Sequence, residues 1–336
     1  MSDRLPIAII GCGKMGRLHA RVCSQLPRVR LVGVYDTSHL AAKAAAAEFA
    51  VPAFDSIDDL LAQARAVCIA VPTVHHLAVA RQCLLRKVPC LIEKPIAPDS
   101  DSARQIVDLA RQAGVVVQVG HIERFNPAVR AMCGLNMAPR FIEVIRVSPL
   151  TFRGIDVGVV LDMMIHDIDI VLRLAGSEIT HVSAVTVSVL GEGAGEDVCN
   201  ARLTFANGCV ANLAASRLSL KTERKLRVFS PDAYVSLDYH KKHATVIRRG
   251  RNLSAIRDAV SQIRAGQITD LSQLNFTELV DMEELTISDA EPARAQMESF
   301  VASVLDSAPV EVSADQGLAA VRTAERIVQA ARPQSL

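Results

Sequence analysis

The segment VVLDMMIHDIDIVL contains an acid and a base at a helical spacing, Asp162 and His166. Residues four apart share one face of an α-helix, so the carboxylate and the imidazole are expected to lie side by side. A neighbouring carboxylate orients an imidazole and raises its basicity, which predicts a general base near neutral pH. Two alternatives stay open. His166 could be a core histidine, or it could bind a metal with Asp162 and Asp169, although no cysteine or second histidine cluster supports a metal.

The tripeptide Glu93-Lys94-Pro95 places an ammonium group at the end of an apolar run. A charge at the end of a buried strand is costly unless it is used or paired, so Lys94 is predicted to work in a site. Pro95 sets the direction of the chain, and the Lys94–Pro95 bond is a candidate for the cis form. The alternative is a structural Glu–Lys pair at the surface.

The stretch PIAIIGCGKMG at residues 6–16 has the GxGxxG pattern, and a second apolar run ends at Asp36, twenty residues after Gly16. Gly11 would allow a tight turn, Gly13 the close approach of a pyrophosphate, and Gly16 the packing of helix on strand. The pyrophosphate would lie at the N-terminus of the following helix. Asp36 would bind the adenosine ribose and repel a 2′-phosphate, which predicts NAD rather than NADP. A turn without a ligand is the alternative. The predicted cofactor residues here are Gly11, Gly13, Lys14, Met15, Gly16, Asp36 and Thr37.

A further candidate loop is VPTVHH at 71–76, which follows another apolar run. It would carry the chain across the nicotinamide side of the cofactor before the next helix begins. An ordinary turn is the alternative. The cofactor residues predicted from this loop and from the lysine segment are Val71, Pro72, Thr73, His76, Glu93 and Lys94.

Strands must alternate with helices to place these segments at one edge of a sheet, and residues 6–121 have that pattern. The strands are continuous apolar runs, as expected when helices cover both faces of a parallel sheet. The predicted fold class is α/β, with an N-terminal Rossmann domain (a doubly wound parallel sheet) over 1–121. We expect strands at 6–10, 30–35, 66–71, 89–93 and 115–120, with helices at 15–26, 38–49 and 76–87.

After His121 the pattern changes to short strands joined by tight turns, which indicates an open, mostly antiparallel sheet. Residues 122–336 are therefore predicted to form a second domain of the α+β class. The basic run at 240–251 is expected to be a solvated hairpin, and 252–290 predicts no definite element. We expect strands at 141–147, 181–190, 198–206, 209–217, 225–230 and 233–239, and helices at 157–174, 292–306 and 315–331.

Composition narrows the class of protein. At 336 residues the chain can bury two cores, and its net charge of +1 predicts neither a nucleic-acid nor a membrane partner. No apolar run approaches the length of a membrane span, and the first strand follows MSDRLP too closely for a signal peptide. The eight cysteines are scattered singly, which fits a reducing cytoplasm. We expect a cytoplasmic protein with a small-molecule substrate and no metal.

GCGKMG, then EKP, then a DxxxH helix occur in this order, and this arrangement resembles the Gfo/Idh/MocA family of sugar and cyclitol oxidoreductases. The resemblance extends through the closing segments EPARAQMESF and DQGLAAVRTAERI. It implies that Lys94 is the active-site lysine, His166 the catalytic base and Asp162 its acidic companion. It also implies a second domain that binds substrate and whose open sheet forms a homodimer or homotetramer. An inositol or free-sugar dehydrogenase and a non-catalytic NAD-sensing module are the alternatives.

The segment GHIERFNPAVR at 120–130 resembles the subgroup of this family that acts on nucleotide sugars in lipid A assembly. The resemblance implies oxidation of UDP-N-acetylglucosamine at C3 to a keto sugar, which a partner aminotransferase would consume. Arginine suits a diphosphate because its guanidinium presents paired donors. Arg124 could instead pair with Glu123. The predicted substrate-binding residues are Lys94, Arg124, Asn126, Arg153, Asp162 and His166.

Overall fold

The computed structural model describes residues 4–151, 157–190, 195–239, 241–248, 250–268 and 282–334. Within them the chain forms two compact units. The first comprises the residues up to Asn126 together with Ala290–Glu325, and the second comprises Pro127–Asp289 and the residues from Arg326 onward. This division differs from the continuous domains expected at 1–121 and 122–336.

The return of the chain to the first unit has a packing reason. Helix α9 (Pro292–Leu305) buries Met297, Phe300 and Val301 in the same hydrophobic core as the first strands and helices. Burial of such side chains is worth about 1.5–3 kcal/mol each, which favours this helix on the first unit. The apolar pattern at 292–306 predicted the helix correctly, but it contained no information about the unit on which the helix packs.

The first unit is built on a parallel sheet, as predicted. In the described part of the chain its five strands have the order β2-β1-β3-β4-β5, and each neighbouring pair is parallel. The order reverses between β1 and β3, so the carboxyl ends of these strands border a ligand crevice in folds of this type. The strands are β1 (Leu5–Ile10), β2 (Val29–Tyr35), β3 (Ala66–Ile69), β4 (Cys90–Glu93) and β5 (Val117–Gly120). The helices are α1 (Lys14–Gln25), α2 (His39–Phe49), α3 (Ile57–Gln63), α4 (His76–Leu85) and α5 (Ser100–Ala113), with short turns η1 (Thr73–His75) and η2 (Ile122–Phe125).

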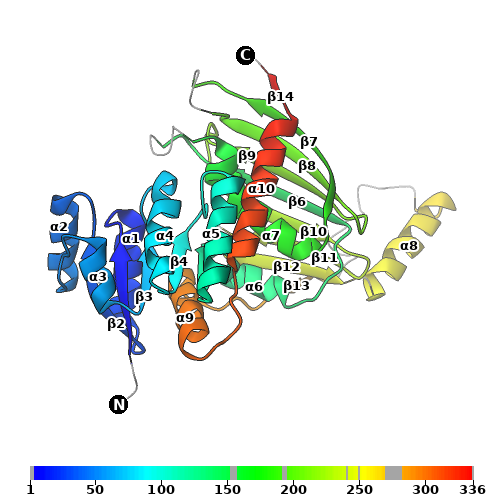
Figure 1. The fold of residues 1–336 in the computed structure, drawn as a ribbon. Helices are drawn as coiled ribbons and strands as arrows, with labels where there is room; N and C mark the ends of the chain where they lie inside the picture. Colours follow the sequence, from blue (N-terminus) through cyan, green and yellow to red (C-terminus); the bar gives the residue numbers. More distant parts are fainter. Residues whose placement is uncertain are drawn as a thin grey trace. The chain divides into compact units, whose positions relative to one another are not determined.

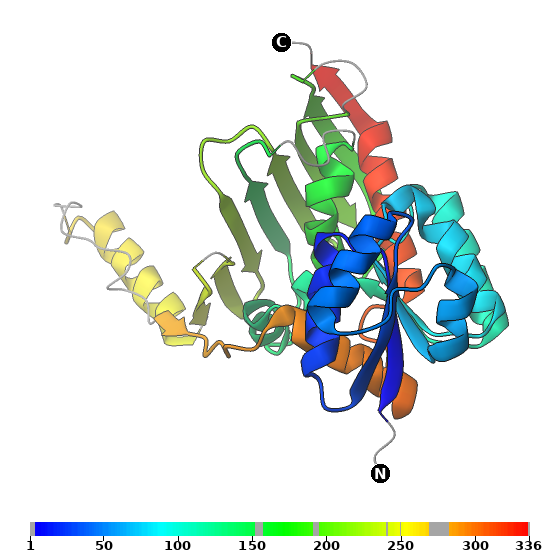
Figure 2. The ribbon, with the colours of Figure 1, turned by 90° about the vertical axis from the view of Figure 1, so that its left-hand side faces the viewer.

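The second unit contains a larger mixed sheet, drawn mainly in green in Figures 1 and 2. Its described strands have the order β13-β12-β11-β10-β6-β9-β8-β7-β14. The pairs β6–β9 and β7–β14 are parallel and the others are antiparallel, which confirms the prediction of a mostly antiparallel sheet. The strands are β6 (Phe141–Val147), β7 (Ile179–Val187), β8 (Val198–Phe205), β9 (Val210–Ser216), β10 (Glu223–Phe229), β11 (Ala233–Asp238), β12 (His243–Arg248), β13 (Met282–Glu284) and β14 (Ala331–Gln334).

Helices cover one face of this sheet because its strands alternate buried and partly exposed residues. Along β6 every second side chain is buried, and the helix α7 (Ile165–Ala175) packs on β9. The other helices with residues in this unit are α6 (Pro127–Cys133), α8 (Gly250–Arg264) and the end of α10 (Ala314–Ala330). The basic run at 240–251 contributes β12, which forms an antiparallel pair with β11 as a hairpin requires, and then the start of α8.

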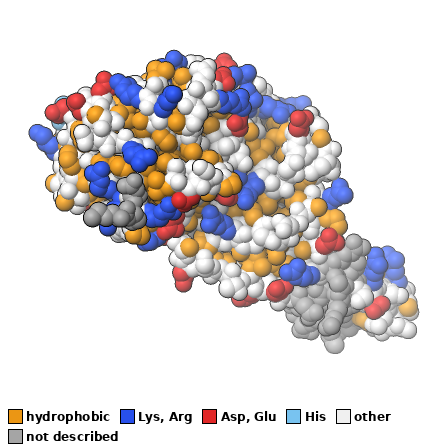
Figure 3. Space-filling view, turned by 60° about the horizontal axis from the view of Figure 1, so that its bottom comes forward, with side chains coloured by type: hydrophobic (Ala, Val, Ile, Leu, Met, Phe, Trp, Pro, Cys, Tyr) orange, Lys and Arg blue, Asp and Glu red, His pale blue; other side chains and the backbone are white. Residues whose placement is uncertain are grey.

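The surface is of mixed charge. On the face shown in Figure 3 acidic and basic side chains are interspersed with small groups of hydrophobic ones, as expected for a formal net charge of +1. Among the described residues, no helix has both the length and the hydrophobicity that crossing a bilayer requires.

Candidate active site

The three glycines of the turn between β1 and α1 have different surroundings. A side chain on Gly11, whose φ is +97°, would lie 2.6 Å from the carbonyl of Ala70, and one on Gly16 would overlap the Gly11 carbonyl. Around Gly13, by contrast, no described atom beyond its own residue and its chain neighbours lies within 4 Å of the position that a Cβ would take. Gly11 and Gly16 therefore let the chain pack against itself, whereas Gly13 leaves open space at the start of α1.

That open space fits the pyrophosphate of a dinucleotide. The first N–H groups of an α-helix have no acceptor within the helix, and they favour an anion at its N-terminus. Lys14 is exposed in this turn and Met15 is partly buried. The glycine turn and the beginning of α1 are thus suited to hold the phosphates of NAD.

Asp36 follows β2 directly and is fixed by two backbone groups. Its Oδ2 accepts a hydrogen bond from the Cys12 N–H at 2.7 Å, and its Oδ1 accepts one from the Ser38 N–H at 2.8 Å. Each carboxylate oxygen has a further lone pair, so Asp36 can also accept hydrogen bonds from ribose hydroxyls. Burial, and next the charge of Asp36, raises the pKa of the Cys12 thiol to about 11, so this cysteine stays protonated. Thr37, the residue after Asp36, is exposed.

His76 is a buried bridge between two strand ends. Its Nε2 lies 3.0 Å from the Val71 carbonyl oxygen, and its Nδ1 lies 3.0 Å from that of Pro95. Burial lowers the pKa of the imidazole, although the surrounding carbonyls act in the opposite direction. His76 therefore packs between the Val71–Thr73 loop and the turn that follows β4, and in its neutral form it donates a hydrogen bond to one of the two carbonyls. The Lys94–Pro95 bond in that turn is cis.

Glu93 is also buried, and its partner is a histidine of the glycine-turn helix. Its Oε1 lies 2.6 Å from His19 Nε2, and its Oε2 accepts a hydrogen bond from the Lys94 N–H at 3.3 Å. Burial acts to raise the pKa of Glu93, but the hydrogen bond and charge of His19 outweigh it and hold the pKa below its usual value. A surface Glu–Lys pair, the alternative at the sequence level, does not describe this carboxylate. Gly120 accommodates Glu93, because a Cβ there would lie 2.9 Å from the Glu93 Cα.

Sequence reasoning missed His19. The available signal was its position, three residues after Gly16 and so on the face of α1 that packs against the sheet. His19 is fully buried there. Buried polar groups in proteins are hydrogen-bonded, so a histidine on this face indicates a partner on a neighbouring strand.

The second unit contains the acid and the base, and here the structure corrects one prediction. The uninterrupted α-helix expected at 157–174 begins instead with a π-helical turn (Val160–Met164), in which the Ile165 N–H donates to the Val160 carbonyl five residues back. Asp162 lies in this π-turn and His166 lies in the first turn of α7. The spacing of four residues between Asp162 and His166 therefore does not place them on one helical face in the way that a regular α-helix would. π-helical turns occur frequently at functional sites.

Asp162 and His166 are both partly buried, whereas the neighbouring Asp167 and Asp169 are fully buried. Arg146 on β6 binds Asp167 through two hydrogen bonds, of 2.6 and 2.8 Å. In the parts of the chain that the structure describes, no group of three or more histidine, cysteine or acidic side chains is arranged to hold a metal ion.

The segment predicted to bind a nucleotide sugar begins in the first unit. Arg124 is buried in η2, and the Asn126 amide donates to Glu123 Oε2 at 3.2 Å. Arg153 lies outside the described residues. The structure thus brings the glycine turn, Asp36, the Val71–Thr73 loop and Lys94 to the carboxyl ends of one parallel sheet, and it places Asp162 and His166 on a single helix of the second unit.

Comparison with known proteins finds a family match in each of the two units. The family described as "Oxidoreductase family, NAD-binding Rossmann fold" matches residues 5–121, and the "GFO/IDH/MocA C-terminal domain" matches residues 149–235. UDP-N-acetylglucosamine 3-dehydrogenase of Acidithiobacillus ferrooxidans is 39% identical over 243 residues, which are 72% of this chain and 76% of that protein. Inositol 2-dehydrogenase of Rubrobacter xylanophilus is 32% identical over 186 residues, which are 50% of this chain and 51% of that protein.

A solved structure resembles the whole chain. It is that of the same enzyme from Acidithiobacillus ferrooxidans, with a TM-score of 0.85 and 31% identity over 98% of each chain. The glycine turn and Lys94 lie inside the first matched range, and Asp162 and His166 lie inside the second. The chain therefore belongs to the Gfo/Idh/MocA family of oxidoreductases, and its first unit contains that family's NAD-binding Rossmann domain.

Proposed function

We propose that the protein oxidises the C3 hydroxyl of UDP-N-acetylglucosamine to a ketone, with NAD as the electron acceptor. The observation that carries the proposal is the similarity to UDP-N-acetylglucosamine 3-dehydrogenase, over 72% of the chain in sequence and 98% in structure. The residues that this chemistry needs are present, namely a base, an ammonium group and an acidic residue near the base.

In the proposed reaction, His166 removes the proton of the substrate hydroxyl. Lys94 binds the same oxygen and stabilises the negative charge that develops on it. Asp162 lies near the start of the helix that carries His166 and keeps the imidazole basic. NAD held by the glycine turn and Asp36 would supply the hydride acceptor that this oxidation needs. The alcohol thus loses one hydride and one proton and becomes a ketone.

Cofactor choice rests on Asp36. Its carboxylate is fixed by the Cys12 and Ser38 N–H groups, so it cannot readily turn away from a 2′-phosphate. Like charges in a partly desolvated site repel, which favours NAD over NADP. The glycine turn with Lys14, Met15 and Thr37, the loop of Val71, Pro72, Thr73 and His76, and the pair Glu93–Lys94 would surround the dinucleotide.

Arg124, Asn126 and Arg153 would bind the diphosphate and the sugar of the substrate. We place the reaction in the cytoplasm, as a step in making lipid A precursors, where an aminotransferase would consume the keto sugar. The residues that follow the Rossmann domain would bind substrate and oligomerise. The larger sheet offers a surface for a homodimer or homotetramer, because its strands present partly exposed residues between the buried ones.

The test is a panel of alcohols assayed with NAD and NADP. The panel contains UDP-N-acetylglucosamine, free N-acetylglucosamine and myo-inositol, and mass spectrometry detects any ketone, trapped as the amino sugar by a coupled aminotransferase. We expect turnover of the UDP-sugar and poor turnover of the free sugar, since binding of the UDP group helps to position the reacting carbon. Faster oxidation of myo-inositol would replace this proposal with a cyclitol dehydrogenase, a candidate that the similarity to inositol 2-dehydrogenase supports.

A further inference from the structure

The start of the helix that carries Asp162 and His166 is held by side chains to which the proposed reaction gives no role. We propose that Glu196 and Arg217, with Asp197, are positioning residues that keep this helix in its reactive geometry. The proposal rests on the function proposed above, because it assumes that Asp162 and His166 serve the reaction. All three residues belong to the second unit.

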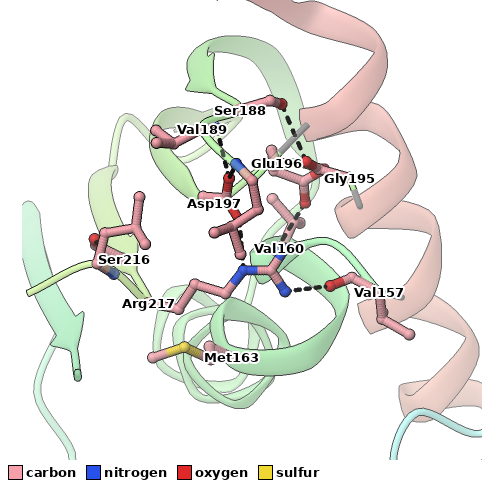
Figure 4. A network of polar contacts seen from close by, with 12 residues as sticks. Val157, Val160, Met163, Ser188, Val189, Gly195, Glu196, Asp197, Ser216 and Arg217 are labelled. Carbon is pink, nitrogen blue, oxygen red and sulfur yellow. Dashed lines mark hydrogen bonds and ion pairs between the residues drawn. The ribbon is translucent and has the colours of Figure 1, made fainter. Parts of the chain in front are cut away.

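Glu196 binds the beginning of the helix with its backbone and its side chain (Figure 4). Its carbonyl accepts a hydrogen bond from the Val159 N–H at 2.8 Å, and its Oε1 accepts one from the Val160 N–H at 2.9 Å. The negative charge of this carboxylate also interacts favourably with the partial positive charge at the helix N-terminus. The contact is close, since a side chain on Gly158 would overlap the Glu196 carboxylate and one on Gly195 would lie 2.7 Å from the Gly158 Cα.

Arg217 connects the same turn to the sheet. It follows β9, and its guanidinium donates to Asp197 Oδ1 at 2.6 Å and to the Val157 carbonyl at 2.8 Å (Figure 4). Both ionic side chains are buried, at 5% and 0% exposure. Burial acts to raise the pKa of Asp197, but two backbone N–H groups and Arg217 outweigh it and lower the pKa. The carboxylate thus stays charged and fixes the guanidinium that binds the helix start.

A second buried ion pair lies beyond the π-turn. Arg146 binds Asp167, the residue directly after His166. The π-turn at Val160–Met164 therefore lies between two anchors, Glu196 with Arg217 before it and Arg146 after it. A π-turn that relaxes to α-helix shifts the register by one residue, a rotation of about 100°. Such a rotation would move Asp162 relative to His166. Glu196 and Arg217 would therefore affect the rate of the reaction as well as the stability of the protein.

Three substitutions separate the contacts. Glu196→Ala removes the acceptor for the Val160 N–H, whereas Glu196→Gln keeps an acceptor oxygen and removes only the charge. Arg217→Lys keeps a cation beside Asp197 but cannot reproduce the forked guanidinium that also reaches the Val157 carbonyl. Ser188→Ala is the matched control. It removes the 3.0 Å hydrogen bond that the Ser188 hydroxyl donates to the Gly195 carbonyl in the same loop, and it leaves the Glu196 and Arg217 side chains unchanged.

We expect kcat to fall by about tenfold to a hundredfold in Glu196→Ala and Arg217→Lys, as when a reacting group is misplaced by about 1 Å. The KM for the sugar and the Kd for NADH should stay near the wild-type values. Glu196→Gln should recover most of the lost kcat, and Ser188→Ala should match the wild type. Hydrogen–deuterium exchange at residues 159–164 should be faster in the two impaired variants only.

Wild-type kcat or unchanged exchange in folded Arg217→Lys would refute the positioning role, and so would a parallel loss of NADH affinity. If Glu196→Ala does not fold, the kcat and the exchange of Arg217→Lys and Glu196→Gln still test the positioning role. If the wild-type protein oxidises none of the panel substrates, the proposed function fails. Exchange in the variants then still shows whether Glu196 and Arg217 hold the turn.

Discussion

The Glu93 carboxylate lies 2.6 Å from His19 Nε2, across 74 residues of sequence, and joins the helix after the glycine turn to the strand that ends at Lys94. Both side chains are almost fully buried. The two segments that would hold the cofactor and the substrate oxygen are therefore mechanically linked within the first unit.

His19→Ala should destabilise the protein in a pH-dependent way. Removal of one partner of a buried hydrogen bond leaves the other group unsatisfied, which costs about 1–3 kcal/mol and more for a charged group such as the Glu93 carboxylate. The pKa of Glu93 is lowered, so its stabilising contribution is present above the ordinary value of about 4.3 and is lost as pH falls through the folded-state pKa. The Tm difference from the wild type should be large at pH 7 and should narrow towards pH 3. A Tm difference that does not change with pH would contradict this role. His19→Gln, which keeps a hydrogen-bond donor, should lose less stability than His19→Ala.

Asp36→Ala should reduce the preference for NAD. The carboxylate repels the 2′-phosphate of NADP, and its contact with the ribose exists in both ground and transition states. The change should therefore appear mainly in the KM for NAD. Kinetics with both cofactors test it, with Asp101→Asn, an exposed carboxylate in α5, as the charge control. Equal kcat/KM for NAD and NADP in the wild type would disprove the assignment.

Lys94→Met and His166→Asn should strongly reduce kcat without loss of fold or cofactor binding. Loss of a positioned acid or base reduces the rate by about 10²–10⁴. Steady-state kinetics measure the loss, and fluorescence titration with NADH shows whether the binding site persists. Near-normal kcat in His166→Asn across pH would identify another base, and Asp162 would be tested next.

Arg124→Ala should impair turnover of the UDP-sugar much more than NADH binding, because the guanidinium would bind the diphosphate. Arg124 is buried, so the melting temperature of each variant must be compared alongside its kinetics. Arg130→Ala, an exposed arginine six residues later, is the control. A substrate KM unaffected by Arg124→Ala would remove this residue from the substrate site.

Much of the first unit could be predicted from sequence, because its signals are local. Continuous apolar runs predicted β1 to β5 within a few residues, and the glycine spacing located the turn where Gly13 leaves room for a phosphate. The strands β6 to β11 of the second sheet followed from alternation and turn residues, and β6 was predicted at its exact bounds, whereas β13 and β14 were not predicted. In each case the information lies within about ten neighbouring residues.

Contacts between residues that are far apart in the sequence were decided by the tertiary structure alone. The sequence could not show that α9 packs on the first unit, that His19 faces Glu93, or that Glu196 reaches the Val160 N–H, since each pairing depends on which faces meet after folding. The π-turn at Val160–Met164 belongs here too, because the apolar pattern of VVLDMMIHDIDIVL also fits a regular helix. The sequence by itself determined most of the elements and the reactive residue types. Packing between elements decided which buried charges find each other, because an unpaired buried charge costs several kcal/mol and folding selects the arrangement that pairs it.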